Sequence, residues 1–541
     1  MNKPRFLIIG WDGATFDIIA PLVASGRLPN VASIMRQGSW GRLESTVPPL
    51  TPIAWTSIST GVNPGKHGIF DAMVYSPRER RVKFINAASR KVKPIWSLLS
   101  ERGKTVGVMN VPVTYPIDAV NGPFIAGMFT PAGVSDFMHP PELKAQIEKK
   151  FGRYLIECRH EKDPSDYLDA IIDVEVDFRE RVASYLMGIS NWDFFFLVFM
   201  ASDRVQHFFW KYLDPSHPQH ARFGDAIAQV YERMDHALGA LIEQAGPDTT
   251  IIMVSDHGSG PLTSAFFLNN WLIKNGYLRL RRDLFDAARE KTASPLASFT
   301  KRALNKIIPA EVRARLKFEK QDAVQEELNF FYSLIDWERT TAFSEGVAGG
   351  IYVNPHTVTA ERIGGLLDGL KQGLLDVRDP SGKRVIKEVI RGSDAYHGDF
   401  ASEAPDLIVL CDAGYQIISP NEFFYFNKKF EDSLFLDHRW SGRHEQHGIL
   451  LAKGPQVNAG VELHGSRIID VAPTLLYLMG EPVPEHMDGR VLREMVDPGL
   501  LRRNPVSFSA EVMAQQSGSA ALSDEEERRI SEQLKSLGYM E

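Results

Sequence analysis

The clearest pattern along the chain is a series of short runs in which apolar residues follow one another without polar alternation. Such runs are typical of strands buried on both faces, as in a parallel sheet covered by helices. The four clearest runs occupy residues 6–9, 194–199, 250–254 and 449–452, and weaker candidates occupy 105–111, 124–126, 351–353 and 406–410.

Between these runs, apolar residues recur at the helical period. Residues 164–189, 224–245 and 468–479 predict helices on this basis. The second of them is amphipathic. Its apolar side consists of Ile227, Val230, Met234, Leu238 and Leu241. Strands that alternate with helices predict an α/β fold with a largely parallel central sheet and helices on both faces.

The size and composition of the chain narrow this picture. A length of 541 residues is too great for one simple core, so two or three structural units are expected. The formal net charge of −7 argues against general nucleic-acid binding. Only two cysteines are present, which excludes a disulfide framework and a thiolate metal cage. The first apolar run is too short for a signal peptide or a membrane span, so the cytoplasm is the expected compartment.

Acids and an imidazole follow three of the predicted strands. Asp12 comes after residues 6–9, Asp203 after 194–199, and Asp256 with His257 after 250–254. The carboxyl ends of parallel strands meet at one edge of a sheet, where ligands collect. Carboxylate and imidazole donors suit Zn²⁺ or Mn²⁺. Taken singly, each residue has a plainer reading as a helix cap or a turn residue.

Two further histidines complete a candidate metal set. His207 lies four residues after Asp203, so a helix places both on one face, where they can chelate one ion. The alternative is that Asp203 caps the helix and His207 packs beside aromatic residues. His444 lies in an apparent loop before the strand at 449–452, with His447 as the alternative ligand. His67 and His397 are weaker site candidates, at a turn and in a loop respectively.

Thr51 precedes Pro52 and is expected at the N-cap of a helix. Helix N-termini favour a phosphate or an alkoxide, because they carry free N–H groups and a partial positive charge. Thr51 can therefore be a nucleophile, provided that a base or a metal activates its hydroxyl. The plainer reading is that it only caps the helix.

The chain divides on these patterns into a catalytic domain at residues 1–278 and 336–500, a helical insertion at 279–335, and a linker with a C-terminal helix at 501–541. The stretch 279–320 is rich in Lys and Arg. It can be a solvated helical face, a lid that attracts an anionic substrate, or a surface for peripheral contact with anionic lipid.

Several motifs together resemble the alkaline phosphatase superfamily, in its type I phosphodiesterase/nucleotide pyrophosphatase branch. The likeness is greatest to the predicted phosphohydrolase/phosphomutase members. It covers about residues 5 to 490 apart from the basic insertion. The motifs that carry it, in chain order, are Trp11-Asp12-Gly13, Thr51-Pro52, residues 60–68 ending in Lys66-His67-Gly68, residues 202–207, Ser255-Asp256-His257-Gly258 and Gly442-Arg443-His444.

The resemblance implies a three-layer sandwich and two divalent metal ions, Zn²⁺ first and Mn²⁺ as the alternative. Asp203, His207 and His444 are then expected to hold one ion. Asp12, Asp256, His257 and the Thr51 oxygen are expected to hold the other. Thr51 would become phosphorylated by a phosphate monoester or diester, and water would then release the phosphate. A phosphorylated small molecule is the expected partner, and the oligomeric state is left open.

Two departures from relatives bear on the substrate. Residues 70–72 read Phe-Asp-Ala where the nucleotide diesterases carry a phosphate-binding Asn, which weakens a nucleotide-diester assignment. The nucleophile region has no Cys/Ser-x-Pro-x-Arg signature, which disfavours sulfate esters. Two rival functions stay open: a phosphomutase or phosphotransferase that uses the same residues, and a non-catalytic binding protein with a vestigial site.

Overall fold

The computed structural model describes residues 5–76, 81–158, 163–281, 332–345, 348–418, 434–436, 440–511 and 522–537. The insertion predicted at 279–335 lies almost entirely outside these residues, as does part of the predicted linker within 501–541. The lid and lipid-contact readings of residues 279–320 therefore stay predictions.

A nine-stranded sheet forms the centre of the molecule, in the order β19-β2-β18-β9-β1-β8-β5-β6-β7. All of its strands run in one direction except β18 and β7. The three middle strands, β9, β1 and β8, are buried throughout except at Arg5, and the apolar runs predicted from the sequence lie within them. The bounds are β1 Arg5–Trp11, β2 Ser39–Glu44, β5 Val106–Met109, β6 Phe124–Ile125, β7 Met138–His139, β8 Phe194–Phe199, β9 Thr249–Val254, β18 His447–Lys453 and β19 Val461–Arg467.

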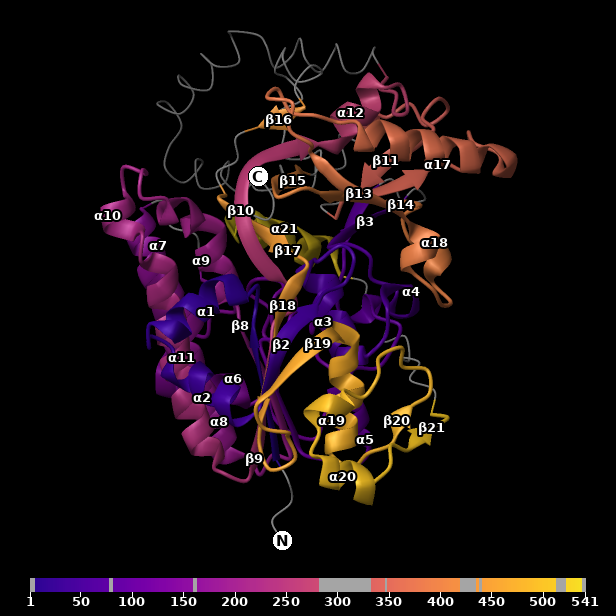
Figure 1. Ribbon diagram of the computed structural model, residues 1–541. Helices are drawn as coiled ribbons and strands as arrows, with labels where there is room; N and C mark the ends of the chain where they lie inside the picture. Colours follow the sequence, from indigo (N-terminus) through magenta and orange to yellow (C-terminus); the bar gives the residue numbers. More distant parts are fainter. Residues whose placement is uncertain are drawn as a thin grey trace, which may run out of the picture.

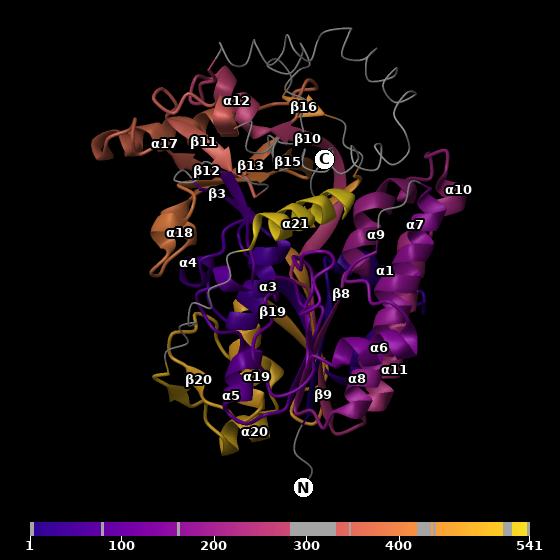
Figure 2. The same cartoon turned by 180° about the vertical axis from the view of Figure 1, so that it is seen from behind.

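Helices cover both faces of this sheet (Figures 1 and 2). One layer contains α1 (Phe16–Ala24), α2 (Pro29–Gln37), α8 (Arg179–Ile189) and α11 (Ala226–Ala245). The opposite layer contains α3 (Thr51–Thr60), α5 (Ile95–Glu101) and α19 (Val471–Leu478). The apolar side of α11 predicted from the sequence is buried in full. The three-layer α/β sandwich is therefore confirmed.

The helical prediction for residues 164–189 needs one correction. The segment is helical throughout, but a π-helical stretch at Ile171–Phe178 joins α7 (Pro164–Ala170) to α8. A π-helix closes its hydrogen bonds over five residues instead of four. The spacing of apolar residues does not distinguish it from an α-helix.

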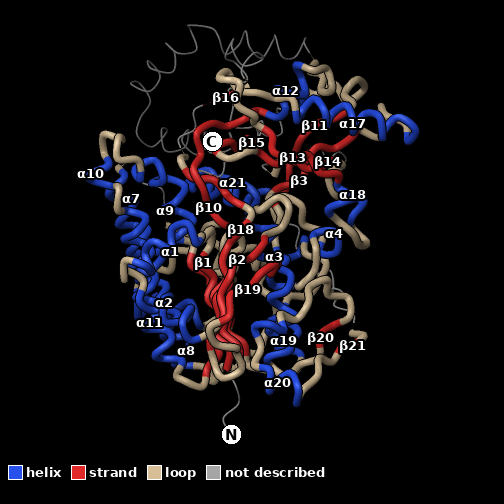
Figure 3. The backbone as a smooth tube through the Cα atoms, viewed as in Figure 1, coloured by secondary structure: helices blue, strands red, loops and turns tan. Residues whose placement is uncertain are grey.

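A second, smaller unit lies beyond the upper edge of the central sheet (Figure 3). It contains an antiparallel sheet in the order β11-β12-β14-β13, and α17 (Ala360–Leu375) packs on β13. The strand β10, ten residues long, follows β9 along the chain but lies outside the central sheet, and it pairs with β15. The bounds are β10 Gly258–Phe267, β11 Ala342–Glu345, β12 Gly350–Val353, β13 Ile386–Arg391, β14 Leu407–Cys411 and β15 Gly414–Ile418.

The glycines after His257 begin a strand, and the loop expected around His444 is a strand as well. Gly258 opens β10, which pairs in antiparallel register with β17 (Gly442–Glu445). Close backbone contacts explain the glycines at both positions. A Cβ at Gly258 would lie 2.2 Å from the carbonyl oxygen of His447, and one at Gly442 would lie 2.3 Å from that of Gln206.

Near the C-terminus, α21 (Asp524–Leu537) is the charged helix that the sequence predicts, and it buries Ile530. Among the described residues, no single helix has the length and apolarity to cross a membrane. One bent pair of helices, Phe16–Ala24 with Pro29–Gln37, meets those two criteria only when its members are taken together.

Candidate metal centre

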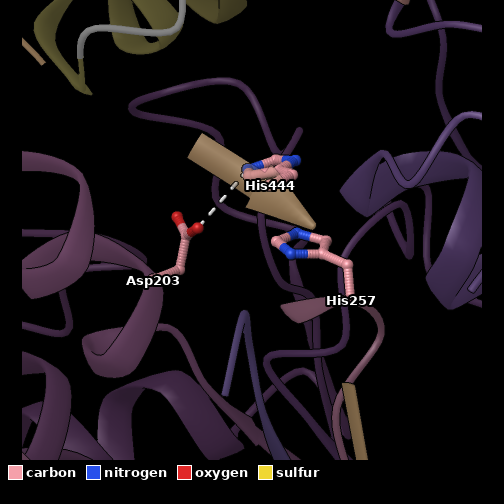
Figure 4. Close-up of side chains that lie close together, drawn as sticks. All are labelled: Asp203, His257 and His444. Atoms are coloured by element: carbon pink, nitrogen blue, oxygen red, sulfur yellow. Dashed lines mark ion pairs between the residues drawn. The ribbon is translucent and has the colours of Figure 1, made fainter. Parts of the chain in front are cut away.

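The acids and histidines singled out in the sequence converge at the carboxyl edge of the central sheet. Asp12 directly follows β1, Asp256 follows β9, and Asp203 lies in α9 (Ala201–Phe209), which begins just after β8. His444 comes from a different part of the chain. The register of β17 with β10 sets it opposite Ser259, two residues beyond His257. Figure 4 shows three of these side chains facing one another: Asp203 from α9, His444 from β17, and His257 from the turn between β9 and β10.

The first donor set consists of Asp203, His207 and His444. Oδ1 of Asp203 lies 3.1 Å from Nε2 of His207 and 3.5 Å from Nε2 of His444. The two Nε2 atoms are 3.1 Å apart. Donors of a tetrahedral zinc ion at roughly 2.0–2.1 Å lie about 3.3 Å from one another. The spacing of these three atoms therefore fits one ion.

The second donor set surrounds His257. Its Nε2 lies 3.3 Å from Oδ2 of Asp256, 3.6 Å from Oδ1 of Asp12 and 3.1 Å from Oγ1 of Thr51. His257 is also close to the first set, because its ring stacks on that of His444 with centroids 3.7 Å apart. His257 thus belongs to both groups of side chains that could hold a cation: Asp203 with His257 and His444, and Asp12 with Asp256 and His257.

Backbone carbonyls fix the orientation of all three imidazoles. Nδ1 of His207 lies 2.8 Å from the oxygen of Gly442, Nδ1 of His257 2.9 Å from that of Gly258, and Nδ1 of His444 3.0 Å from that of Pro49. When such a ring is neutral, Nδ1–H donates to the carbonyl and the Nε2 lone pair points into the site. Metal-binding histidines commonly have such an outer partner.

The electrostatics of the site favour a bound cation. Burial raises the pKa of the Asp12 carboxyl well above its ordinary range, and the Asp203 charge raises it further. Burial and the Asp12 charge likewise raise the pKa of Asp256. Burial lowers the pKa of His257 and His444. For Asp203, burial raises the pKa, but His207 and His444 outweigh it, so that the net shift is downward.

In the donor set around His257, two carboxylate oxygens have no hydrogen-bond partner among the described residues: Oδ1 of Asp12 and Oδ2 of Asp256. Both side chains are fully buried, and a buried polar atom without a partner costs about 1–3 kcal/mol. In addition, Nε2 of His207 and Nε2 of His444, which are both acceptors when Nδ1 carries the proton, lie only 3.1 Å apart. A cation in each donor set relieves both problems, so the residues present fit divalent metal ions.

Thr51 is the first residue of α3, and Leu50 is its N-cap, so the expected N-cap position of Thr51 is wrong by one residue. Pro52 stands at the second helical position, where its missing N–H also costs nothing. The Thr51 side chain is fully buried, with its hydroxyl toward His257. Its oxygen thus lies at the second donor set and at the positive end of a helix.

Some contacts that hold the site were not expected from the sequence. The indole of Trp55 donates to Oδ2 of Asp12 at 2.7 Å, and the backbone N–H of Gly13 donates to Oδ1 of Asp256 at 3.2 Å. Trp55 has a faint sequence signal, since it lies one helical turn after Thr51. Its partner, Asp12, is far from it in the sequence, so the contact itself could not be predicted from local spacing.

The other candidate histidines lie away from the donor sets. His447 is exposed at the start of β18, so His444 rather than His447 faces Asp203. His67 is buried, and its Nε2 lies 2.9 Å from Oγ of Ser57. The pKa of His67 is lowered to about 3 by burial and the nearby Arg90 charge. His397 pairs with Asp488 at 3.0 Å.

Solved structures share the fold at low sequence identity. Murine ectonucleotide pyrophosphatase / phosphodiesterase 5 (ENPP5), an inactive threonine-to-alanine variant in complex with AMP, is 14% identical with a TM-score of 0.51, covering 92% of this chain and 100% of that chain. Phosphonoacetate hydrolase from Sinorhizobium meliloti 1021, in complex with phosphonoformate, is 13% identical with a TM-score of 0.54, covering 88% and 95%.

Sequence comparison goes further than these structural likenesses. No curated protein matches the chain. The profile of the family described as type I phosphodiesterase / nucleotide pyrophosphatase, however, matches residues 6–423, which is most of the chain. The resemblance inferred from the motifs is therefore confirmed: this chain belongs to the type I phosphodiesterase / nucleotide pyrophosphatase family and is a phosphoric ester hydrolase.

Proposed function

We propose that the chain hydrolyses phosphate monoesters or diesters at two divalent metal ions, with Thr51 as the nucleophile. The observation that carries the proposal is the position of the Thr51 oxygen. It lies 3.1 Å from Nε2 of His257, the imidazole that stands between the two donor sets. A threonine that only capped a helix would turn its hydroxyl toward the backbone N–H groups of that helix, whereas the Thr51 hydroxyl is directed toward His257.

In this proposal the residues divide as follows. Asp203, His207 and His444 hold one ion, and Asp12, Asp256 and His257 hold the other. Bound ions would lower the pKa of the Thr51 hydroxyl and neutralise charge on the phosphoryl oxygens. Zn²⁺ is the proposed metal, because three imidazoles and three carboxylates suit it, and Mn²⁺ is the alternative.

The chemistry then proceeds in two displacements. Thr51 gives its hydroxyl proton to solvent, its oxygen attacks phosphorus, the bond from phosphorus to the leaving oxygen breaks, and that oxygen takes a proton from water. In the second displacement a water molecule loses a proton and attacks the phosphothreonine, the bond from phosphorus to Oγ1 breaks, and Oγ1 takes a proton, which regenerates Thr51. Ester and water are thereby converted into alcohol and phosphate, or into alcohol and monoester if the substrate is a diester.

Two structural relatives support this choice of chemistry. Phosphonoacetate hydrolase has the same fold and was solved with phosphonoformate, a compact phosphonate. The ENPP5 structure with AMP is of a variant inactivated by replacing one threonine with alanine. Both are consistent with a threonine-dependent phosphoryl or phosphonyl site on this fold.

Thr51→Ala tests the proposal directly. After loading with Zn²⁺ or Mn²⁺, kcat for 4-nitrophenyl phosphate and bis(4-nitrophenyl) phosphate should fall by about 10³-fold or more. Thr51→Ser, which keeps a hydroxyl, should retain part of the activity. Metal content by elemental analysis should be similar in all three proteins. Full activity of Thr51→Ala with both ions bound would exclude Thr51 as the nucleophile.

A further inference from the structure

A small pocket lies directly beside the candidate metal centre. It has a volume of about 130 Å³, and His444 and Leu50, the neighbour of Thr51, are among the residues that line it. His444 is also the most exposed of the seven site residues. Its side chain is 13% exposed, whereas those of Asp12, Thr51, Asp203, Asp256 and His257 are fully buried. Among the described residues, the pocket therefore marks the side from which the centre can be reached.

The walls of this pocket are mostly uncharged. Leu50, Val409, Leu410 and Ile417 supply apolar surface. Cys411 is a neutral thiol, because burial raises its pKa to about 12. These residues give the pocket an uncharged, mostly apolar lining on the side of β14 and β15.

Arg443 and Glu445 neutralise each other at the rim. Nε of Arg443 donates to Oε1 of Glu445 at 2.9 Å, and Nη2 donates to the same oxygen at 2.7 Å. Nη1 donates to the carbonyl oxygens of Asp412 and Tyr415. The guanidinium is thus fixed with most of its donors in use, and its charge is balanced within the pocket wall.

Lys387 is the remaining charged residue that lines the pocket. It forms no ion pair within the described parts of the chain. It stands at a β-bulge in β13, where the register with β14 passes from Ile386↔Cys411 to Glu388↔Leu410 and leaves Lys387 without an opposite residue. Bulges redirect side chains and are common next to active sites. In a regular strand, buried and exposed side chains alternate. At this bulge two adjacent side chains, Lys387 and Glu388, are both exposed.

We propose that this pocket binds the leaving group of the substrate and selects a compact group with an anionic end, with Lys387 as the specificity-determining residue. The inference rests on the proposed function and adds the substrate class to it. Pockets for drug-sized ligands measure roughly 300–1,000 Å³. A volume of about 130 Å³ therefore suits a carboxylate or a second phosphate on a short linker rather than a nucleoside.

Three model substrates and one variant test the proposal: ethyl phosphate has a neutral leaving group, phosphoglycolate a carboxylate, and pyrophosphate a second phosphate. Lys387→Ala should raise KM about three- to tenfold for one or both anionic substrates, with little change in kcat. Ethyl phosphate should change less than about twofold. Which anionic substrate responds identifies the preferred anion.

Lys371→Ala is the matched control, because Lys371 is an exposed lysine on α17 that does not line the pocket. It should leave all three substrates unchanged. Equal losses for neutral and anionic substrates in Lys387→Ala, or no loss for any, would overturn the proposal.

A binding measurement separates this proposal from the failure of Thr51 chemistry. Calorimetry on metal-loaded Thr51→Ala should show tighter binding of phosphoglycolate or pyrophosphate than of ethyl phosphate. The added substitution Lys387→Ala should remove that preference. If the wild-type protein hydrolysed none of the substrates but this binding preference held, the result would support anion binding in the pocket and contradict hydrolysis through Thr51. A binding preference that persisted without Lys387 would overturn the pocket assignment alone.

Discussion

The indole N–H of Trp55 donates a 2.7 Å hydrogen bond to Oδ2 of Asp12, and both side chains are fully buried. The bond occupies one oxygen of Asp12 and leaves Oδ1 toward His257. Trp55 lies on α3 one turn after Thr51, so the same contact ties the helix of the proposed nucleophile to a proposed metal ligand. Gly10 permits the close approach, since a Cβ there would lie 2.4 Å from Cη2 of Trp55.

Trp55→Phe should weaken metal binding, because it removes the partner that orients Asp12 and keeps most of the ring volume. Loss of such outer partners typically costs about 10–100-fold in metal affinity. Competition with a chromophoric chelator measures this affinity independently of activity. The lost activity should return in part at saturating metal.

Trp96→Phe is the matched control for Trp55→Phe. Trp96 is buried as well, and its indole donates to Oδ2 of Asp118 at 2.8 Å, away from the donor sets. It should lower thermal stability to a similar extent without changing metal affinity. Equal metal affinities of Trp55→Phe and the wild type would show that Trp55 only packs.

Metal binding should release protons and strengthen as the pH rises. Burial raises the pKa values of Asp12 and Asp256, and the Asp203 charge raises that of Asp12 and the Asp12 charge that of Asp256, so these acids retain protons above the ordinary carboxyl value of 3.8. A cation must displace those protons. Calorimetry in buffers of different ionisation enthalpy counts the protons released. Binding that is independent of pH between 5 and 8 would contradict the assignment.

The same shifts predict the stability of the metal-free protein. A carboxyl whose folded pKa is raised contributes stability below its unfolded pKa, and this contribution is lost as the pH rises through the folded pKa. Asp12→Asn removes one such group and should raise Tm of the metal-free protein by roughly 2 °C or more at pH 8. With metal present the order should reverse, because the variant lacks a ligand. Thermal melts with and without chelator provide both comparisons.

His444→Ala and His447→Ala distinguish two histidines that are three residues apart. His444 lies 3.5 Å from Oδ1 of Asp203, whereas His447 is exposed on β18. His444→Ala should lose at least one of the two bound ions and reduce activity about 100-fold or more. His447→Ala should keep both. A loss of metal in His447→Ala alone would show that the ligand assignment is wrong.

Much of the site was predictable because its members follow strands that the sequence marks plainly. Asp12, Asp203 and Asp256 each follow an apolar run, and parallel strands bring their carboxyl ends to one edge. The four-residue spacing of Asp203 and His207 predicted their shared helix face. The N-cap assignment of Thr51 was wrong by one residue, because sequence motifs locate helix ends only to within one or two residues.

The sequence by itself determined the buried strands, the family and the types of donor atom. A buried strand is a run of adjacent apolar residues, so the local sequence is enough to predict it. Only the tertiary structure decided that His257 stands between the two donor sets, that Trp55 fixes Asp12, and that Lys387 reaches the pocket beside His444. Each of these depends on the pairing and packing of segments far apart in the chain, and such contacts have no signal in the spacing of adjacent residues.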